Sequence, residues 1–250
     1  MCDKYHPLIC ILFISSAVSI GFEHSQFTIN EDASNLELCL RLHGGELDRH
    51  VNLSVNTAGR AQPSVDYSAL QDITFYPDDK SRKCLDISIT DDHIVEEDES
   101  FTLTLTSLDS AISLSPDTVT VLISDNDKVV LAIQQPSYTV QESAEELQLS
   151  IEIVDGILDR SVSLAVESRD GNASARTGDY TSLSETLIYT SGSSSGSILT
   201  LMVEVGDDQL VEGLESFTIH ATAVDTSVEL ESGRETTTIF IVDNDVCKLI

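Results

Sequence analysis

Acidic side chains crowd one short stretch of the chain, residues 91–105, which reads DDHIVEEDESFTLTL. Six carboxylates fall within its first nine positions with no lysine or arginine among them, and the segment then becomes an alternating strand. These charges repel one another, so the stretch is either a well-hydrated turn or a place where a cation binds. Carboxylate oxygens are the ligands that calcium prefers.

The same text returns 116 residues later as DDQLVEGLESFTIHA, residues 207–221. Other landmarks recur at similar spacing: the Asp-Tyr pair at 66–67 returns at 179–180, and Asp-Asn-Asp at 125–127 returns at 243–245. Small differences in the spacing indicate loop insertions. The chain is therefore a tandem repeat of one domain of about 110 residues.

The strongly acidic composition excludes some classes of binding partner. The 250 residues carry 43 acidic against 13 basic side chains, a formal charge of -30, which excludes nucleic acid and anionic membrane surfaces because phosphates would be repelled. Hydrophobic residues make up 41% and fall in short alternating runs, a pattern that disordered chains lack. No stretch approaches the roughly 20 apolar residues of a membrane-spanning helix.

The elements that must position the acids are all predicted strands. Leucines at 36, 38, 40 and 42 alternate with polar residues, and similar runs follow at 51–55, 73–76, 85–89, 101–105 and 119–123. With an opening strand this gives about seven strands per copy. We therefore predict an all-β protein of two tandem immunoglobulin-like antiparallel β-sandwiches, residues 18–127 and 128–245. The Ser/Gly-rich stretch 191–197 is interpreted as a flexible hairpin loop.

We expect the first 17 and the last five residues to lie outside the two sandwiches. Residues 1–17 combine a lysine, an apolar run and a small-x-small triplet, which predicts a signal peptide cut after Ala17. The alternative is an incomplete gene model in which these residues lead into a truncated repeat. Residues 246–250 stand where a further, truncated repeat or a C-terminal tail would begin.

Cysteines and asparagines supply further signs of an exported protein. Cys39 and Cys84 are cysteine only in the first copy, as a bonded pair would be, although two unrelated thiols remain the alternative. Asn52-Leu-Ser and Asn172-Ala-Ser are glycosylation sequons. Asn172 is the better candidate, because its surroundings read as a loop and Asn52 lies within a predicted strand.

The acids are distributed as if to converge on one end of each sandwich. Glu31 follows the first strand, Asp91 and Asp92 end a later one, and Asp125 and Asp127 end the last. Antiparallel connections bring such loops to the same tip. Calcium takes six to eight oxygen ligands in irregular geometry, whereas magnesium demands a tighter octahedron and zinc prefers His or Cys. The set therefore favours calcium over both other ions.

The motif DD-x-x-V-E-x-x-E-S-F, the earlier Asp-Tyr, the opening F/Y-T-I/V-x-E and the closing D-N-D together resemble the Calx-beta domain in both copies. That resemblance implies an immunoglobulin-like sandwich that binds calcium at one tip. Carried over residue by residue, the implied ligands of the first copy are Glu31, Asp66, Asp91, Asp92, Glu96, Glu99, Asp125 and Asp127. Those of the second copy are Glu142, Asp179, Asp207, Asp208, Glu212, Glu215, Asp243 and Asp245.

The leading functional hypothesis is a secreted or cell-surface structural module, in which calcium rigidifies the tandem domains for cell-matrix or cell-cell interaction. Its expected partners are calcium ions, other extracellular or cell-surface proteins, and neighbouring repeats of a longer chain. One alternative is a calcium-sensing regulatory region of a membrane transporter or receptor. Another is a structural array without a functional calcium site.

Enzyme activity is not expected from this sequence. The six histidines are scattered, none of them in a motif with a nucleophile, and tryptophan, the usual platform of a sugar-binding cleft, is absent. Tyr67, Phe101, Tyr180 and Phe217 recur beside the acids. We expect these four rings to pack beneath the loops.

Overall fold

The computed structural model describes residues 18–79 and 82–246. The predicted signal peptide, Cys247 and nearly all of the predicted tail lie outside these residues. The described residues form two compact units: one holds 18–79 and 82–91 together with 99–124, and the other holds 92–98 together with 125–246. Within the described residues, no helix is both long and apolar enough to cross a membrane.

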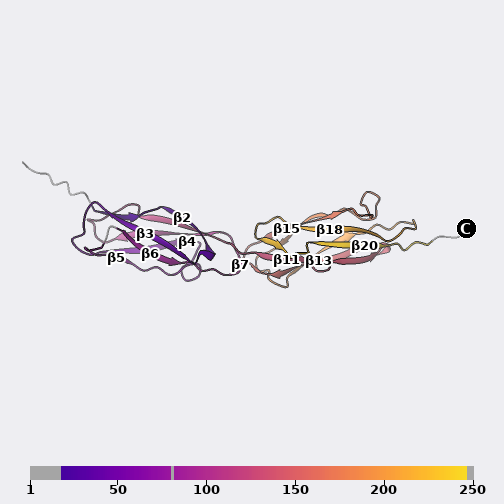
Figure 1. Ribbon diagram of the computed structural model, residues 1–250, viewed down its shortest axis with the longest axis horizontal. Helices are drawn as coiled ribbons and strands as arrows, with labels where there is room; N and C mark the ends of the chain where they lie inside the picture. Colours follow the sequence, from indigo (N-terminus) through magenta and orange to yellow (C-terminus); the bar gives the residue numbers. More distant parts are fainter. Residues whose placement is uncertain (1–17, 80–81, 247–250) are drawn as a thin grey trace, which may run out of the picture. The chain divides into compact units, whose positions relative to one another are not determined.

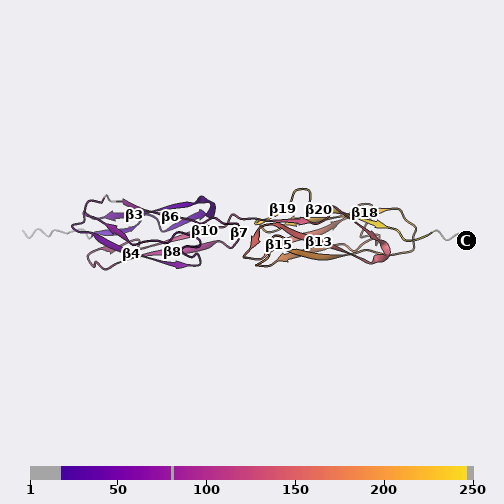
Figure 2. The ribbon, with the colours of Figure 1, turned by 90° about the horizontal axis from the view of Figure 1, so that it is seen from below.

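The first unit is a sandwich of two sheets (Figure 1). One sheet has the order β6 (Arg82–Ser88), β3 (Asn35–His43), β1 (Ser19–Phe22), β9 (Ser113–Leu114). The other has the order β2 (Gln26–Asn30), β10 (Thr118–Ser124), β8 (Glu99–Ser107), β4 (Val51–Gly59), β5 (Ile73–Phe75). Figure 2 shows the two layers edge-on, with β3 and β6 in one and β4 and β8 in the other.

The second unit repeats this topology strand for strand. Its sheets run β17 (Ile198–Glu204), β13 (Glu146–Asp155), β11 (Val129–Ile133), β19 (Val228–Leu230) and β12 (Ser137–Gln141), β20 (Thr236–Val242), β18 (Glu215–Ala223), β15 (Val162–Arg169), β16 (Ser184–Tyr189). The all-β tandem sandwich is thus confirmed. Counted over residues 18–79 and 82–246, each sandwich has nine strands where about seven were predicted, because the opening strand divides between the two sheets and a short strand is added before the last.

The core of each sandwich follows from the alternation of side chains along the strands. In β8, Phe101, Leu103 and Leu105 are almost completely buried, whereas the threonines between them face the other side. Side chains that point inward from both sheets close the interior, which is how a half-buried strand stabilises a sandwich. The two cores are separate clusters, and Val95 belongs to the second.

The Ser/Gly-rich stretch 191–197 corrects one prediction. It joins β16 to β17, which lie in different sheets of the second unit, so it is a crossover between sheets and not a hairpin loop. Its backbone is hydrogen-bonded to β14 (Ile157–Leu158): the Leu158 N–H donates to Ser193 O at 2.9 Å, and the Gly192 N–H donates to Leu158 O at 2.7 Å. The prediction was wrong because a composition rich in serine and glycine indicates a flexible loop but does not indicate which strands the loop connects.

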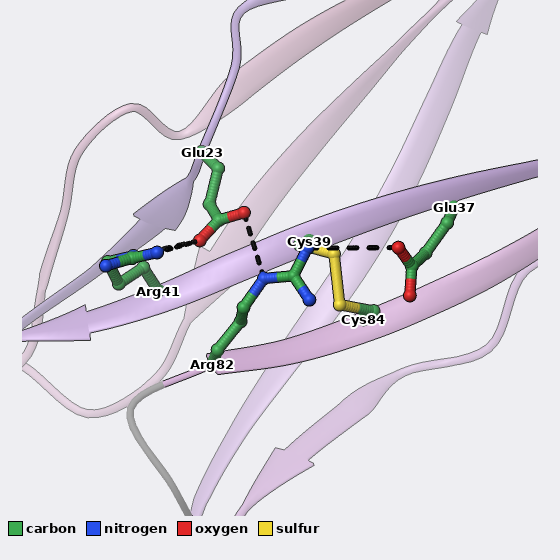
Figure 3. Close-up of a disulfide and its surroundings, with 6 residues drawn as sticks. All are labelled: Glu23, Glu37, Cys39, Arg41, Arg82 and Cys84. Atoms are coloured by element: carbon green, nitrogen blue, oxygen red, sulfur yellow. Dashed lines mark hydrogen bonds and ion pairs between the residues drawn. A yellow bond between two sulfur atoms is a disulfide. The ribbon is translucent and has the colours of Figure 1, made fainter.

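Cys39 and Cys84 form a disulfide across β3 and β6, where they are directly paired, with a Cα–Cα distance of 4.0 Å (Figure 3). The bond lies on the outer face of the sheet, because its neighbours Leu38 and Leu40 point into the core. Glu23 lies beside it and accepts hydrogen bonds from Arg41 at 2.6 Å and from Arg82 at 3.1 Å. Covalent and ionic contacts therefore hold this edge of the sheet.

Candidate metal centre

Carboxylates line a small pocket at one end of the second sandwich. Six of the eight ligands predicted for the second copy contribute to it, namely Glu142, Asp179, Asp208, Glu212, Glu215 and Asp243. Each comes from a strand end or a loop: Glu142 opens the 3-10 turn η2 (Glu142–Ala144) after β12, Asp243 follows β20, and Glu215 begins β18. The strand topology gathers at one tip groups that lie up to about a hundred residues apart in the chain.

Two groups of oxygens in this pocket lie close enough together to hold an ion. One carboxylate oxygen from each of Glu142, Asp208 and Glu212 lies within 4.8 Å of the others. The same holds for Asp179, Glu212 and Glu215. Glu212 belongs to both groups. The arrangement therefore offers two adjoining all-oxygen sites, which suit a hard cation such as calcium and not zinc.

Glu142 is the buried member of the cluster, with 4% of its surface exposed. Its Oε1 accepts a hydrogen bond from the Asp208 N–H at 2.9 Å, while Oε2 is buried and has no hydrogen-bond partner in the part of the chain that the structure describes. A buried carboxylate oxygen without a donor is costly, on the order of 1–3 kcal/mol or more for a charged group. A cation at this position would satisfy that oxygen.

Hydrogen bonds from backbone N–H groups fix the three aspartates of the pocket in place. Asp208 Oδ1 accepts from the Leu210 N–H at 2.6 Å, and Asp243 accepts from Glu212 at 2.8 Å and from Asp245 at 2.7 Å. Asp179 Oδ2 accepts from the Ser174 N–H at 2.7 Å. Backbone groups thus orient the carboxylates of Asp179, Asp208 and Asp243 before any ligand binds.

Desolvation and repulsion between the carboxylates raise the pKa values of two glutamates. Burial, reinforced by the charge of Asp208, raises the pKa of Glu212. Burial and the charge of Asp179 likewise raise the pKa of Glu215. A bound cation would reverse both effects, because an opposite charge favours the ionised form.

Glycine backbones make room for this geometry. A Cβ added to Gly206 would lie 1.9 Å from the carbonyl oxygen of Gly178, and the Gly206 N–H donates to Asp179 O at 3.0 Å. Gly178 itself has φ of +103°, a conformation that favours glycine. Sequence reasoning missed both glycines. The repeat gave no signal for them, because the matching positions of the first copy are Val65 and Thr90.

The remaining two predicted ligands of the second copy do not line the pocket. Asp207 accepts a hydrogen bond from the Asn244 side chain at 2.8 Å. Asp245 donates its backbone N–H to Asp243, as described above. Asp245 therefore supports a pocket ligand from outside the pocket, whereas Asp207 contacts Asn244.

The predicted ligands of the first copy divide between the two compact units. Glu31, Asp66, Asp91 and Glu99 belong to the first. There Glu31 is buried at the start of the 3-10 turn η1 (Glu31–Ala33), and the Asp66 carboxylate accepts from the Gln62 N–H at 2.5 Å. Burial and the charge of Asp66 raise the pKa of Glu99, whereas Arg60, 3.0 Å away, lowers it. Arg60 was missed because a single arginine outside the acidic stretch gives no signal in the sequence.

Asp92, Glu96, Asp125 and Asp127 belong to the second unit. Asp92 Oδ1 accepts from the Ile94 N–H at 2.8 Å, and Asp125 accepts from Glu96 and from Asp127, both at 3.1 Å. These are the same turns that hold Asp208 and Asp243. The repeated sequence therefore encodes a repeated local geometry.

Both sequon asparagines are exposed and hydrogen-bonded. Asn172 lies in the loop after β15, as expected; its Oδ1 accepts from the Ser216 N–H at 2.8 Å and its Nδ2 donates to Leu214 O at 3.2 Å. Asn52 lies in β4, where its Oδ1 accepts from Thr74 Oγ1 at 2.9 Å. Asn172 thus connects its loop to the start of β18.

Comparison with known proteins gives the same assignment for both halves. The model of the Calx-beta domain family matches residues 14–127 and 124–245. Among solved structures, CBD12 from CALX1.2 is 18% identical, with 89% of this chain and 99% of that chain covered and a TM-score of 0.41. The apo-form Calx CBD1 domain is 25% identical, with coverages of 48% and 100% and a TM-score of 0.43.

The calcium binding domain CBD12 of CALX1.1 is 17% identical, with coverages of 88% and 98% and a TM-score of 0.41. No curated protein matches the sequence. The matches of the family model together span most of the chain, in two consecutive copies.

Proposed function

Because the chain belongs to the Calx-beta domain family, we propose that it is a calcium-binding structural module of the extracellular space, in which the ion stabilises the acidic end of each repeat. The family and the all-oxygen chemistry of the site support the choice of ion. The extracellular setting rests on other features of the chain, considered below.

One observation carries the calcium proposal: Glu142, whose buried Oε2 has no hydrogen-bond partner among the described residues, contributes a carboxylate oxygen to a group with Asp208 and Glu212. Three carboxylates held this close without a counter-charge repel one another. Glu142, Asp208 and Glu212 would hold a first ion, and Asp179 with Glu215 would hold a second beside Glu212. Calcium supplies positive charge and accepts irregular oxygen coordination, so these residues fit it.

Calcium binding would make the stability of the module depend on the ion. A ligand that binds only the folded state stabilises it by RT ln(1 + [L]/Kd), which is about 2.7 kcal/mol at a hundredfold excess over Kd. The carboxylates repel one another when no ion is bound, and binding removes that repulsion. The tip loops would then hold a fixed geometry towards a partner protein.

The extracellular setting is supported by the disulfide between Cys39 and Cys84, since such bonds persist in oxidising compartments. The predicted signal peptide and the two sequons point the same way. Calcium is plentiful outside the cell, so sites with dissociation constants of about 0.1–1 mM would be filled there. A cytosolic sensor requires much tighter sites.

Thermal unfolding of the whole chain tests the proposal. We would record the midpoint in EDTA and then in calcium from micromolar to tens of millimolar, with magnesium as the control. A midpoint that rises only at millimolar calcium supports the extracellular structural module. A rise already complete at micromolar calcium would favour a sensor, and no shift at all would show that the acids are only hydrated turns.

A further inference from the structure

A short parallel strand pair in the second unit holds residues 92–98, which we call the acidic segment, against β14. β7 (Ile94–Val95) pairs with β14, with Ile94 opposite Ile157 and Val95 opposite Leu158. The Asp159 N–H donates to Val95 O at 3.0 Å, and Val95 is completely buried. Residues 157–160, which we call the receiving edge, thus offer the Asp159 N–H as a donor and Leu158 as an apolar contact for Val95.

Arg160 completes that edge. Its Nε donates to Glu96 O at 2.9 Å, while its two terminal nitrogens bind Asp225 at 2.7 and 3.0 Å. The guanidinium of Arg160 is therefore held by Asp225 and binds the backbone carbonyl of Glu96 in the acidic segment. Its charge also suits the acidic segment, because Glu97 and Asp125 both raise the pKa of Arg160, although less than Asp225 does.

The equivalent segment of the second copy makes the same turn hydrogen bonds, but within the described part of the chain no strand pairs with it. Leu210 N–H binds Asp208 and Glu212 N–H binds Asp243, just as Ile94 binds Asp92 and Glu96 binds Asp125. Yet the side chains of this tail segment, residues 210–214, are open to solvent: Leu210 is 61%, Val211 52% and Leu214 63% exposed. Val95, the counterpart of Val211, is 0% exposed.

The receiving edge is also repeated within the chain. Gly-Ile-Leu-Asp-Arg at 156–160 has a counterpart 111 residues earlier, Gly-Glu-Leu-Asp-Arg at 45–49. Leu47 is buried as Leu158 is, and Arg49 binds Asp109 as Arg160 binds Asp225. We call residues 46–49 the head edge. Among residues 18–79 and 82–246, none pairs as a strand with it, and it borders a groove that Val51 and Ile112 also line.

Arg49 differs from Arg160 in one informative way. Its Nε donates to Asp109 at 2.9 Å, where the Nε of Arg160 donates to the docked carbonyl of Glu96. Glu46 stands in the place of Ile157, which is itself 47% exposed, so this change leaves the apolar seat at Leu47 intact. A small rotation of Arg49 would free its Nε for an incoming carbonyl.

We propose that the tail segment of one copy binds the head edge of a second copy, head to tail. Val211 would cover Leu47, the Asp48 N–H would donate to Val211 O, and Arg49 would bind Glu212 O. The second copy is the occupant because the chain already contains the same pair joined at β7 and β14: Val211 and Glu212 of the tail segment correspond to Val95 and Glu96, and Leu47 and Arg49 of the head edge correspond to Leu158 and Arg160. A heterologous contact of this kind produces open chains of molecules and not closed dimers.

The contact is small, so association between separate molecules is expected to be weak. Within one chain the same pairing benefits from a high effective concentration, which separate molecules lack. Sedimentation velocity of the whole chain from micromolar to millimolar protein is therefore the test. We expect a sedimentation coefficient that rises continuously with concentration, as open assembly requires.

Val211→Asp places a charge on an exposed position, so it leaves folding intact, and should weaken association about tenfold or more. Ile188→Asp, at an equally exposed position on β16, is the matched control and should associate like the wild type. Arg49→Gln should also weaken association. A mixture of the Val211→Asp and Arg49→Gln proteins should form pairs joined by their intact ends, but no longer chains.

Runs with calcium and with EDTA are judged on the same variants, so a failure of calcium binding does not decide this proposal. A wild-type protein that stays monomeric at millimolar concentration overturns it. So does association that Val211→Asp leaves unchanged, since another surface would then be responsible.

Discussion

The rings of Tyr180 and Phe217 stack face to face, with centroids 3.8 Å apart and an interplanar angle of 2°. Tyr67 and Phe101 form the same pair in the first unit, at 3.8 Å and 11°. All four rings are buried, and each tyrosine directly follows a predicted ligand in the sequence. The stacked pair is therefore part of each buried core and lies next in sequence to the acids, as expected of rings that recur beside them.

Removing one ring should destabilise the second unit and disturb its site. Phe217→Ala leaves a cavity beneath Glu215 and Asp179, and we expect a loss of about 3–5 kcal/mol in the free energy of unfolding. Urea unfolding followed by circular dichroism measures it. The matched change Phe27→Ala, at a half-buried ring of the first unit, should cost less; an equal cost would show that the stacked pair has no special role.

The phenol of Tyr180 should titrate late. Its hydroxyl donates to Asp170 at 2.5 Å, and burial together with that carboxylate raises its pKa to about 12. Because folding raises the pKa above its ordinary value of 10.0, this contribution to stability is fully present below pH 10 and is lost as the pH rises towards 12.

Absorbance at alkaline pH measures this titration. Burial raises the pKa of Tyr189 to about 12 as well, so Tyr180→Phe should remove one of these two late steps. We expect it to cost about 1–2 kcal/mol at neutral pH through the lost hydrogen bond. If the titration curve of Tyr180→Phe keeps both late steps, the assignment is wrong.

Neutralising the buried glutamate should have opposite effects with and without calcium. Glu142→Gln keeps an acceptor for the Asp208 N–H but removes a buried, uncompensated charge, so the protein in EDTA should gain about 1–3 kcal/mol. In calcium the same variant should lose most of the ion-dependent rise in midpoint. Isothermal calorimetry and thermal unfolding measure both.

Glu229→Gln makes the same change of charge at an exposed position of β19 and should respond to calcium like the wild type. A Glu142→Gln protein that is less stable than the wild type in EDTA would contradict the cost assigned to the orphaned oxygen.

The disulfide should contribute to the stability of the first unit alone. It joins residues 45 apart, and in the chain-entropy model a loop of this length stabilises the folded state by about 4 kcal/mol. The double variant Cys39→Ala with Cys84→Ala should lower the unfolding midpoint of that unit and leave calcium binding by the second unit unchanged. Equal destabilisation of both units in calorimetry would argue against this separation.

The sequence by itself determined the repeat, the all-β class and the identity of the acidic residues. Alternating leucines such as those at 36–42 specify strands locally, because one face of a strand must be buried, and a text repeated after 116 residues specifies a repeated fold. It also singled out Cys39 and Cys84, because they are cysteine in one copy only.

Only the tertiary structure decided which acids meet. Asp208 and Asp207 are neighbours with the same chemistry, yet one lines the pocket and the other binds Asn244. Likewise Val95 and Val211 belong to the same repeated motif, and one is buried against Leu158 while the other is exposed. Burial depends on which distant segment packs against a residue, and the local sequence does not contain that information.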